Sequence, residues 1–284
     1  MIITNRNEVK MQTSLVESGY SNIDNTNNPT KYVRRLDKQG ATNLWQGVKA
    51  QMLSLLEVGK GDSVIDVGCG TGSDVRAIAQ IVGENGRVVG VDSSTTMIQE
   101  ALQRAKGLNL PTEFYVGDAE NLEFPDNSFD CCRVERVLQH LHNPQQSLLE
   151  IVRVANLGAR IVIVEPDYGS IKIEGADPTV TSKLIKRRCS HFRSPNIGMQ
   201  LPLLYKRLEL EKIAVTVTPV VNDNFEDNHE KFLLSKYVEP AVTIGLVSAQ
   251  EGSKWINDLK GAADQGNYRH TISLFLVSGR KPDV

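Results

Sequence analysis

The sequence predicts a doubly wound α/β domain, and two observations support this class. Short β-branched runs alternate with amphipathic segments from Ser63 onward. Continuous apolar strands between amphipathic helices are typical of a parallel sheet that is covered on both faces. A glycine-rich turn also follows the first strand. Sheets of this class bind their ligands at such turns, so a ligand site is expected there.

The alternation defines the order of the elements. Strands are expected at 63–67, 87–91, 112–116, 129–134 and 160–165, with helices at 73–82, 94–106 and 145–154. Upstream of these elements, Leu44, Val48 and Met52 recur on one side of a helical pattern that runs from 31 to 56. We therefore expect N-terminal helices within 31–60 and a cofactor-binding half over 61–165.

The two ends of the chain differ from this pattern. Residues 1–30 are polar and rich in Asn, Ser and Thr, which predicts a flexible segment; a lid that orders over a ligand is the alternative. After Glu165 the alternation breaks, and 166–212 predicts a helical insertion that contacts the substrate. The sheet then resumes at 213–221, followed by a helical stretch over 228–259 and a last strand at 271–278. Residues 31–284 are thus expected to form a single domain, with 213–284 as the C-terminal half of the sheet.

Composition and charge exclude several functional classes. A net charge of −2 with 23% charged residues argues against a general nucleic-acid binder, which usually carries a basic surplus. No apolar stretch approaches the ~18 residues of a membrane span, and the N-terminus does not resemble a signal peptide, so a cytoplasmic location is expected. Four cysteines lack metal-ligand spacing and are interpreted as reduced thiols: Cys69, Cys131, Cys132 and Cys189.

The most informative segment is the run Val-Ile-Asp-Val-Gly-Cys-Gly-Thr-Gly that begins at Val64. Gly68, Gly70 and Gly72 suit a sharp turn that a ligand approaches without meeting a Cβ atom. Dinucleotide enzymes use a longer glycine spacing and bind a phosphate there. Here Asp66 precedes the turn, and an acid aimed at it would repel a pyrophosphate but suit a cationic amino-acid ligand. A tight structural turn is the alternative.

This segment resembles the first motif of the class I S-adenosylmethionine-dependent methyltransferases, and the likeness continues in order through the fifth strand. The resemblance implies S-adenosylmethionine as cofactor, S-adenosylhomocysteine as product and in-line transfer of a methyl group to a small-molecule acceptor. It also implies a seven-stranded, mostly parallel sheet whose last strand, 271–278, is antiparallel. That strand distinguishes the family from dehydrogenases.

Acidic residues follow successive strands. Asp92 ends the second strand, where a carboxylate can accept hydrogen bonds from both ribose hydroxyls. The resemblance implies that Asp118 binds the adenine amino group and that Met97 packs on the adenine; a turn role and a core role are the alternatives. The full set implied for the cofactor is Asp66, Gly68, Cys69, Gly70, Gly72, Asp92, Ser93, Met97, Gly117, Asp118, Ala119, Glu135 and Arg136.

Catalytic and substrate residues are less sharply indicated. His140 is the leading candidate for a general base because its ordinary pKa suits neutral pH, and Glu135 is the second. A structural histidine is the alternative. Polar and aromatic residues that could face the acceptor are Tyr32, Trp45, Asp167, Tyr168, His191 and Arg193. Core aromatics and a solvated basic helix containing Arg187 and Arg188 explain these residues equally well. No metal site is predicted; a magnesium ion bound by Glu165 and Asp167 is the alternative.

Three other functions compete with methylation of a small molecule of the quinone or natural-product type. A nucleic-acid or protein methyltransferase would need an added basic surface, which only 183–193 offers. A non-methylating member of the fold would keep the cofactor site. A nicotinamide dehydrogenase conflicts with the glycine spacing. The sequence does not identify the acceptor or the methylated atom, and it does not decide whether the protein forms a homodimer.

Overall fold

The computed structural model describes residues 19–227 and 234–283. A seven-stranded sheet with the order β3-β2-β1-β4-β5-β7-β6 forms its centre. The strands are β1 (Ser63–Val67), β2 (Arg87–Asp92), β3 (Thr112–Val116), β4 (Phe129–Glu135), β5 (Ala155–Glu174), β6 (Glu211–Asn222) and β7 (Arg269–Arg280). Strands β1 to β5 are parallel, and β7 is antiparallel to both β5 and β6. The predicted fold class is confirmed.

The helices of the described residues begin and end close to their expected positions in the first half of the chain. They are α1 (Thr30–Gly40), α2 (Asn43–Leu56), α3 (Ser73–Val82), α4 (Thr95–Ala105), α5 (Pro144–Val154), α6 (Pro178–Cys189), α7 (Ile197–Arg207), α8 (Phe225–Asp227), α9 (Ser235–Thr243) and α10 (Ala249–Asp264), with the short 3₁₀ helices η2 (Gly19–Asn25) and η3 (Leu138–His140). Ser94 caps α4 by accepting a hydrogen bond from the Met97 backbone N–H.

Neighbouring residues of the central strands β1 and β4 pack on opposite faces of the sheet. On one face Val64 and Cys131 pack with α2 and α3; on the other, Ile65 and Cys132 pack with α5 and α7. This alternation follows from the pleat of a strand. The two faces are therefore both covered by helices, as the apolar strands predict. All four cysteines are free.

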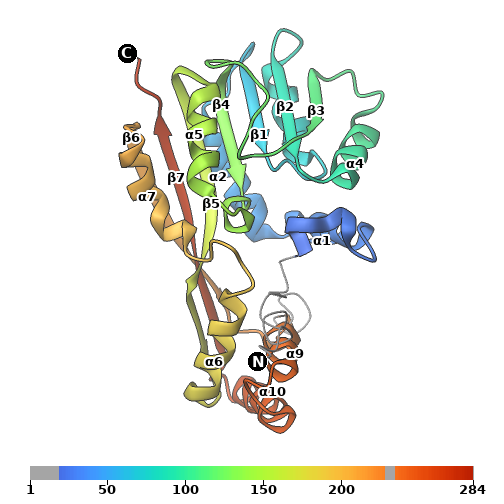
Figure 1. The fold of residues 1–284 in the computed structure, drawn as a ribbon, viewed down its shortest axis with the longest axis vertical. Coiled ribbons are helices and arrows are strands. Elements are labelled where there is room, and N and C mark those ends of the chain that lie inside the picture. Colours follow the sequence, from blue (N-terminus) through green and yellow to red (C-terminus); the bar gives the residue numbers. More distant parts are fainter. Residues whose placement is uncertain (1–18, 228–233, 284) are drawn as a thin grey trace, which may run out of the picture.

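The fifth strand is longer than predicted. Residues 166–174 were expected to open a helical insertion, but they continue β5 and pair with β7, with Lys172 opposite Thr271. Pro166 and Gly169 suggested a break, and the strand accommodates them through a shift of register between Asp167 and Lys172. The long β5–β7 pair, with β6 along β7, extends past β1 to β4 and carries α6, α9 and α10 at its end (Figure 1). The insertion therefore begins only after Glu174.

A separate apolar cluster holds this extension together. Ile171 and Ile173 of β5 pack with Leu184 of α6, Tyr237 of α9 and Trp255 of α10. The helical stretch expected over 228–259 is two helices, α9 and α10, and residues 228–233 lie outside the described residues. None of the described helices is long and apolar enough to cross a membrane.

Residues 19–25, part of the segment for which the composition predicts flexibility, form η2 and contact α4. The Asp24 carboxylate accepts hydrogen bonds from Ser94 Oγ and from the Thr95 backbone N–H, both at 2.7 Å. Ile23 is buried against Met97 and Val33. Residues 1–18 lie outside the described residues. The ordered part of the N-terminal segment therefore closes over the helix that follows Asp92.

Candidate active site

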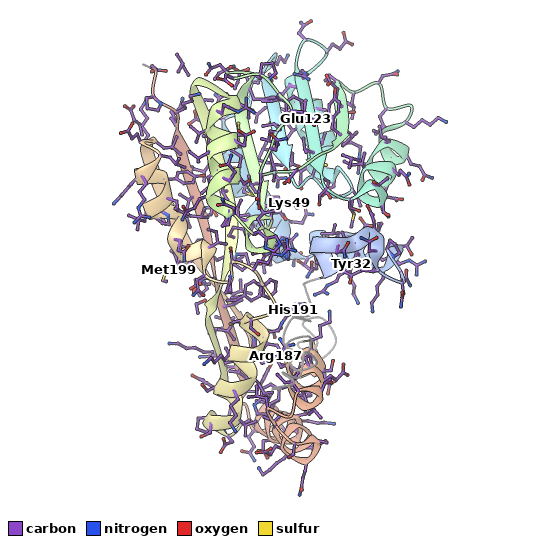
Figure 2. The ribbon with its side chains drawn as sticks, viewed as in Figure 1. Tyr32, Lys49, Glu123, Arg187, His191 and Met199 are labelled. Carbon is purple, nitrogen blue, oxygen red and sulfur yellow. The ribbon has the colours of Figure 1, made fainter. Side chains whose placement is uncertain are left out.

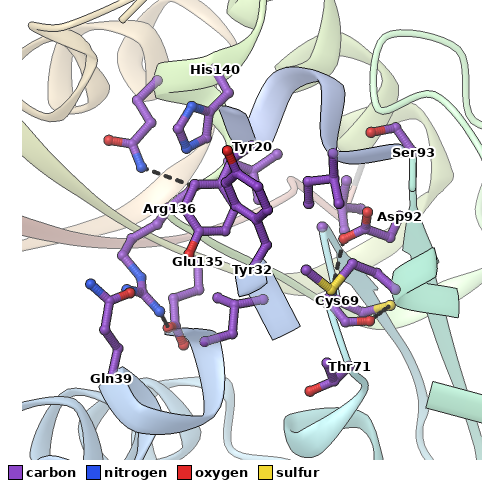
Figure 3. A pocket seen from close by; sticks show the side chains of 18 of the residues that line it. Tyr20, Tyr32, Gln39, Cys69, Thr71, Asp92, Ser93, Glu135, Arg136 and His140 are labelled. Carbon is purple, nitrogen blue, oxygen red and sulfur yellow. Dashed lines mark hydrogen bonds and ion pairs between the residues drawn. The ribbon is translucent and has the colours of Figure 1, made fainter. Parts of the chain in front are cut away.

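A cavity of about 1600 Å³ lies at the carboxyl ends of the central strands. Most of the residues expected to hold the cofactor line it, and they come from the turns after four strands: Gly68, Cys69, Gly70, Asp92, Ser93, Met97, Gly117, Asp118, Ala119, Glu135 and Arg136. In Figure 3, Asp92 and Cys69 lie on one side of the cavity and Glu135 and Arg136 on the other. Asp66 and Gly72 do not line it.

The glycine turn after β1 has a conformation that only glycine tolerates well. Gly68 has a φ of 77°, and a Cβ atom on it would lie 2.1 Å from Cγ2 of Val137. Gly72 also has a positive φ, and its Cβ would lie 2.5 Å from the Phe114 ring. Gly68 thus allows the turn to approach the chain after β4 beside the cavity, whereas Gly72 allows α3 to pack against β3.

Asp92 connects the glycine turn to α4. Its Oδ2 accepts a hydrogen bond from the Gly70 backbone N–H and its Oδ1 one from the Ser94 backbone N–H, both at 2.9 Å. Burial raises the pKa of this carboxyl. Each carboxylate oxygen can accept a second hydrogen bond, which a pair of ribose hydroxyls could donate. The glycine turn and the carboxylate therefore fit a nucleoside.

Asp66 does not line the cavity. It was expected to face a cationic ligand, but Nη1 of Arg133 lies 2.9 Å from both of its carboxylate oxygens. Arg133 stands opposite Asp66 in the β1–β4 register and is buried. Burial raises the pKa of Asp66 to about 7 although Arg133 opposes this shift. The chain itself supplies the cation that Asp66 requires.

Arg133 is the centre of a charge network that the motif did not reveal. It donates to Glu135 at 2.7 Å and lies 3.3 Å from Asp74, and Lys49 pairs with Asp74 at 2.8 Å. Arg136 pairs with Glu135 at 2.8 Å. An arginine in the middle of strand 129–134, between Cys132 and Val134, was the signal in the sequence that could have revealed this network. Lys49, Asp74, Arg133, Glu135 and Arg136 line the cavity, and donors and acceptors of this kind fit the amino and carboxylate groups of an amino acid.

His140 lies in η3 and lines the cavity, as its predicted role requires. Its pKa does not fit that role, because burial and the neighbouring Arg136 lower it to about 3. The imidazole is therefore neutral at pH 7 and a weak base. The argument from an ordinary histidine pKa therefore does not apply to this ring, and its role toward an acceptor stays a prediction. The cysteines also offer no nucleophile, since burial raises the pKa of the Cys131 thiol to about 12.

Glu165, at the end of the parallel part of β5, holds the turn that carries His140. Its Oε1 accepts hydrogen bonds from the Val137 and Leu138 backbone N–H groups, both at 2.7 Å. Its side chain is buried, and burial raises its pKa to about 8. Among the described residues no cluster of three or more His, Cys, Asp or Glu could hold a metal.

Four of the six substrate candidates line the cavity: Tyr32, Tyr168, His191 and Arg193. Trp45 does not; it lies under the Arg136 guanidinium, whose carbon is 3.8 Å from the ring centroid. Asp167 is buried within β5 and does not line the cavity either. Lining residues that the sequence did not single out include Tyr20, Lys31, Arg35, Phe192 and Lys236. Lys31 and Arg35 lie on α1 and Lys236 on α9, and the sequence pattern of these helices does not show that they face the cavity.

The fold and the site together define a Rossmann-like methyltransferase, with an antiparallel β7 beside β5 and an acid-tipped nucleoside pocket. Residues 59–213, which are 155 of the 284, match the family described as "Methyltransferase domain". The chain belongs to this family and is a class I S-adenosylmethionine-dependent methyltransferase.

Relatives are consistent with this assignment. An uncharacterized 37.1 kDa protein in transposon TN4556 of Streptomyces fradiae is 34% identical over 250 residues, which are 86% of this chain and 70% of that protein. The ubiquinone/menaquinone biosynthesis C-methyltransferase UbiE of Hahella chejuensis is 34% identical over 134 residues, 46% of this chain and 52% of that protein. The match therefore spans about half of UbiE. The crystal structure of the YcgJ protein from Bacillus subtilis has the same fold, with a TM-score of 0.56 at 21% identity, covering 84% of this chain and 100% of that one.

Proposed function

We propose that this enzyme methylates a small organic molecule, of the quinone or natural-product type, inside the cavity. The observation that supports the proposal is the extent of that cavity. Its volume of about 1600 Å³ exceeds the ~300–1000 Å³ of a pocket for one small ligand. It continues from the strand ends to side chains of α1, α6 and α9, including Arg35, Arg188 and Lys236. Such a space suits two reactants side by side.

The residues of the strand ends have separate proposed roles toward the cofactor. Asp92 binds the ribose hydroxyls, and Asp118, which is exposed to the cavity, binds the adenine amino group. Met97, which packs against Ile23, also contacts the adenine. Glu135, Arg136 and the Arg133 network bind the methionine end. When bound, S-adenosylmethionine supplies an electrophilic methyl group.

The chain's own residues align the acceptor and exclude water. Tyr20, Tyr32, His140 and Phe192 form a wall of rings in which neighbouring centroids lie 5.0 to 5.8 Å apart. Enclosure and orientation are the main contributions that an enzyme makes to a displacement on an activated methyl. Neutral His140 contributes as a hydrogen-bond partner of the acceptor rather than as a strong base.

The experiment that tests the proposal follows formation of S-adenosylhomocysteine with panels of small organic acceptors, of RNA and of proteins. Acceptor-dependent product in the small-molecule panel supports the proposal. Product formed only with RNA or protein contradicts it. Conversion of a small molecule without S-adenosylhomocysteine would instead identify a non-methylating member of the fold. The homodimer of the sequence analysis stays a prediction.

A further inference from the structure

The cavity is divided by charge. Five of its lining carboxylates belong to the cofactor end: Asp74, Asp92, Asp118, Glu120 and Glu135. The sixth, Asp37, lies on α1 and pairs with Arg104 at 2.7 Å. The opposite end, formed by α1, α6, the loop after α6 and α9, contributes lining cations: Lys31, Arg35, Arg187, Arg188, Arg193 and Lys236. These cations come from segments far apart in the sequence. Figure 2 shows His191 and Arg187 below Tyr32, on the side of the molecule that carries α6.

In the described part of the chain, the central members of this cationic group form no ion pair with a carboxylate, and Glu239 acts on Lys236 only through its charge. Within 19–227 and 234–283, no carboxylate lies within 4.0 Å of the charged groups of Arg35, Arg188 or Lys236. By contrast, the cations at the cofactor end, such as Lys49 and Arg133, are all in ion pairs. Among the described residues the two ends of the cavity thus differ, and the end formed by α1, α6 and α9 has more lining cations than lining carboxylates.

Three of these cationic side chains are partly buried. Arg35, Arg188 and Lys236 are half-buried, whereas Lys183 and Lys186 of the same α6 helix are exposed. Helix α6 therefore has two different faces, and its cavity face is not the solvated basic surface that its composition suggested. Burial and the charges of Arg35 and Arg188 lower the pKa of Lys236 to about 8, as expected where like charges approach one another. Half-buried cations without a counter-charge lose part of their hydration, and an anionic ligand would compensate this loss.

Rings line the space between the cations. Phe192 stacks on Tyr168 at a centroid distance of 3.7 Å, and the Arg188 guanidinium lies 4.9 Å from the Phe192 centroid. The Arg35 guanidinium lies 5.8 Å from the Tyr20 centroid on the other side. A planar or apolar body can pack along these rings, while a terminal anionic group reaches the cations.

We propose that the methyl acceptor is a small organic anion whose carboxylate or phosphate group binds among Arg35, Arg188 and Lys236 and whose planar body packs along Phe192 and Tyr20. The inference rests on the proposed function and narrows its substrate class. A nucleic acid would also be anionic, but the half-buried position of these cations inside a cavity favours a small ligand over a polymer on an open face.

The test is calorimetric titration of the full chain saturated with S-adenosylhomocysteine. The probes are 4-hydroxybenzoate, phenyl phosphate and the neutral amide 4-hydroxybenzamide, which share one ring and differ in charge. We expect an anion to bind at least about tenfold more tightly than the amide, the scale of one well-placed charge contact. The better of the two anions distinguishes a carboxylate from a phosphate acceptor.

Three variants complete the design. Arg35→Gln and Lys236→Gln, singly and combined, should remove most of the preference for the anion and leave the affinity for S-adenosylhomocysteine unchanged. Lys183→Gln, on the exposed face of α6, is the matched control and should keep the preference. Equal binding of the amide and the anions, including no binding of either, would overturn the inference. So would a short RNA that binds more tightly than both anions. Failure of S-adenosylhomocysteine to bind would overturn the proposed function itself, so the two failures are distinguishable.

Discussion

Nη1 of Arg133 lies 2.9 Å from both carboxylate oxygens of Asp66, across neighbouring parallel strands at the base of the cofactor pocket. Both side chains are buried, so neither charge has water as an alternative partner. Removing one member of such a pair leaves an uncompensated charge in the core. The acid of the glycine motif is therefore tied first to the stability of the sheet.

Arg133→Leu should lower the free energy of unfolding by about 3–5 kcal/mol, because Asp66 and Glu135 both lose their buried cation. Urea denaturation measures this loss. The exposed pair Arg87–Glu113 is the control, and Arg87→Gln should cost about 1 kcal/mol or less. Adding Asp66→Asn to Arg133→Leu should restore part of the stability. Equal losses for the two arginines would contradict the interpretation.

Gly68→Ala should unfold the glycine turn or abolish cofactor binding, because the new Cβ would lie 2.1 Å from Val137. Gly61 offers a matched control, since its φ of 85° is similar and nothing lies within 4 Å of its Cβ position. Gly61→Ala should therefore cost only the backbone strain, about 1–2 kcal/mol. Thermal unfolding and calorimetry with S-adenosylhomocysteine measure both effects. If Val137→Ala fails to relieve any of the Gly68→Ala defect, the clash is not its cause.

His140→Ala should lower turnover with little change in cofactor affinity, because the ring lines the acceptor side of the cavity. Since the pKa of His140 is lowered to about 3, the imidazole does not titrate near neutral pH. The pH profile of the wild-type kcat should thus show no step between about pH 6 and 7 that is caused by His140, and the variant's profile should have the same shape. A step of that kind, present in the wild type and lost in His140→Ala, would restore the histidine as a general base.

Glu165 should make the protein less stable as the pH rises. Burial raises its pKa from 4.5 to about 8, so between these values the folded state retains a proton that the unfolded state has lost. The contribution of this group is fully present below pH 4.5 and is lost as the pH rises toward 8. Glu165→Gln should flatten the curve of unfolding free energy against pH in this window. Asp66, whose pKa is also raised, stays in both proteins, and parallel curves would disprove the assignment.

The sequence predicted the parts of the fold that depend on local pattern. The strands from Ser63 to Glu135 and the turns with Gly68, Asp92 and Asp118 follow from apolar periodicity and from glycine at a left-handed turn. The continuation of β5 beyond Glu165 could not be predicted in this way, because its pairing partner is β7, a hundred residues later in the chain. Strand extension of this kind depends on non-local pairing.

For the site too, the sequence predicted the features that depend on local motifs and missed those that depend on contacts between elements. The predicted cofactor residues line the cavity with the exception of Asp66 and Gly72. The pKa of His140 and the Arg133 network depend on burial and on charges from other elements, which spacing along one segment does not encode. Lys31, Arg35 and Lys236 meet the same cavity from α1 and α9, and only the folded arrangement brings them together.

The central claim is that acidic tips of the sheet, Asp92 above all, bind the nucleoside of S-adenosylmethionine. Titration with S-adenosylhomocysteine in a calorimeter tests it most directly, comparing the wild type with Asp92→Ala and with Glu113→Gln, a carboxylate of the same sheet that does not line the cavity. We expect one bound molecule per chain in the wild type and in Glu113→Gln, and binding weaker by about 1–3 kcal/mol in Asp92→Ala. No heat with the wild type, or equal affinity with and without the Asp92 carboxylate, would contradict the claim.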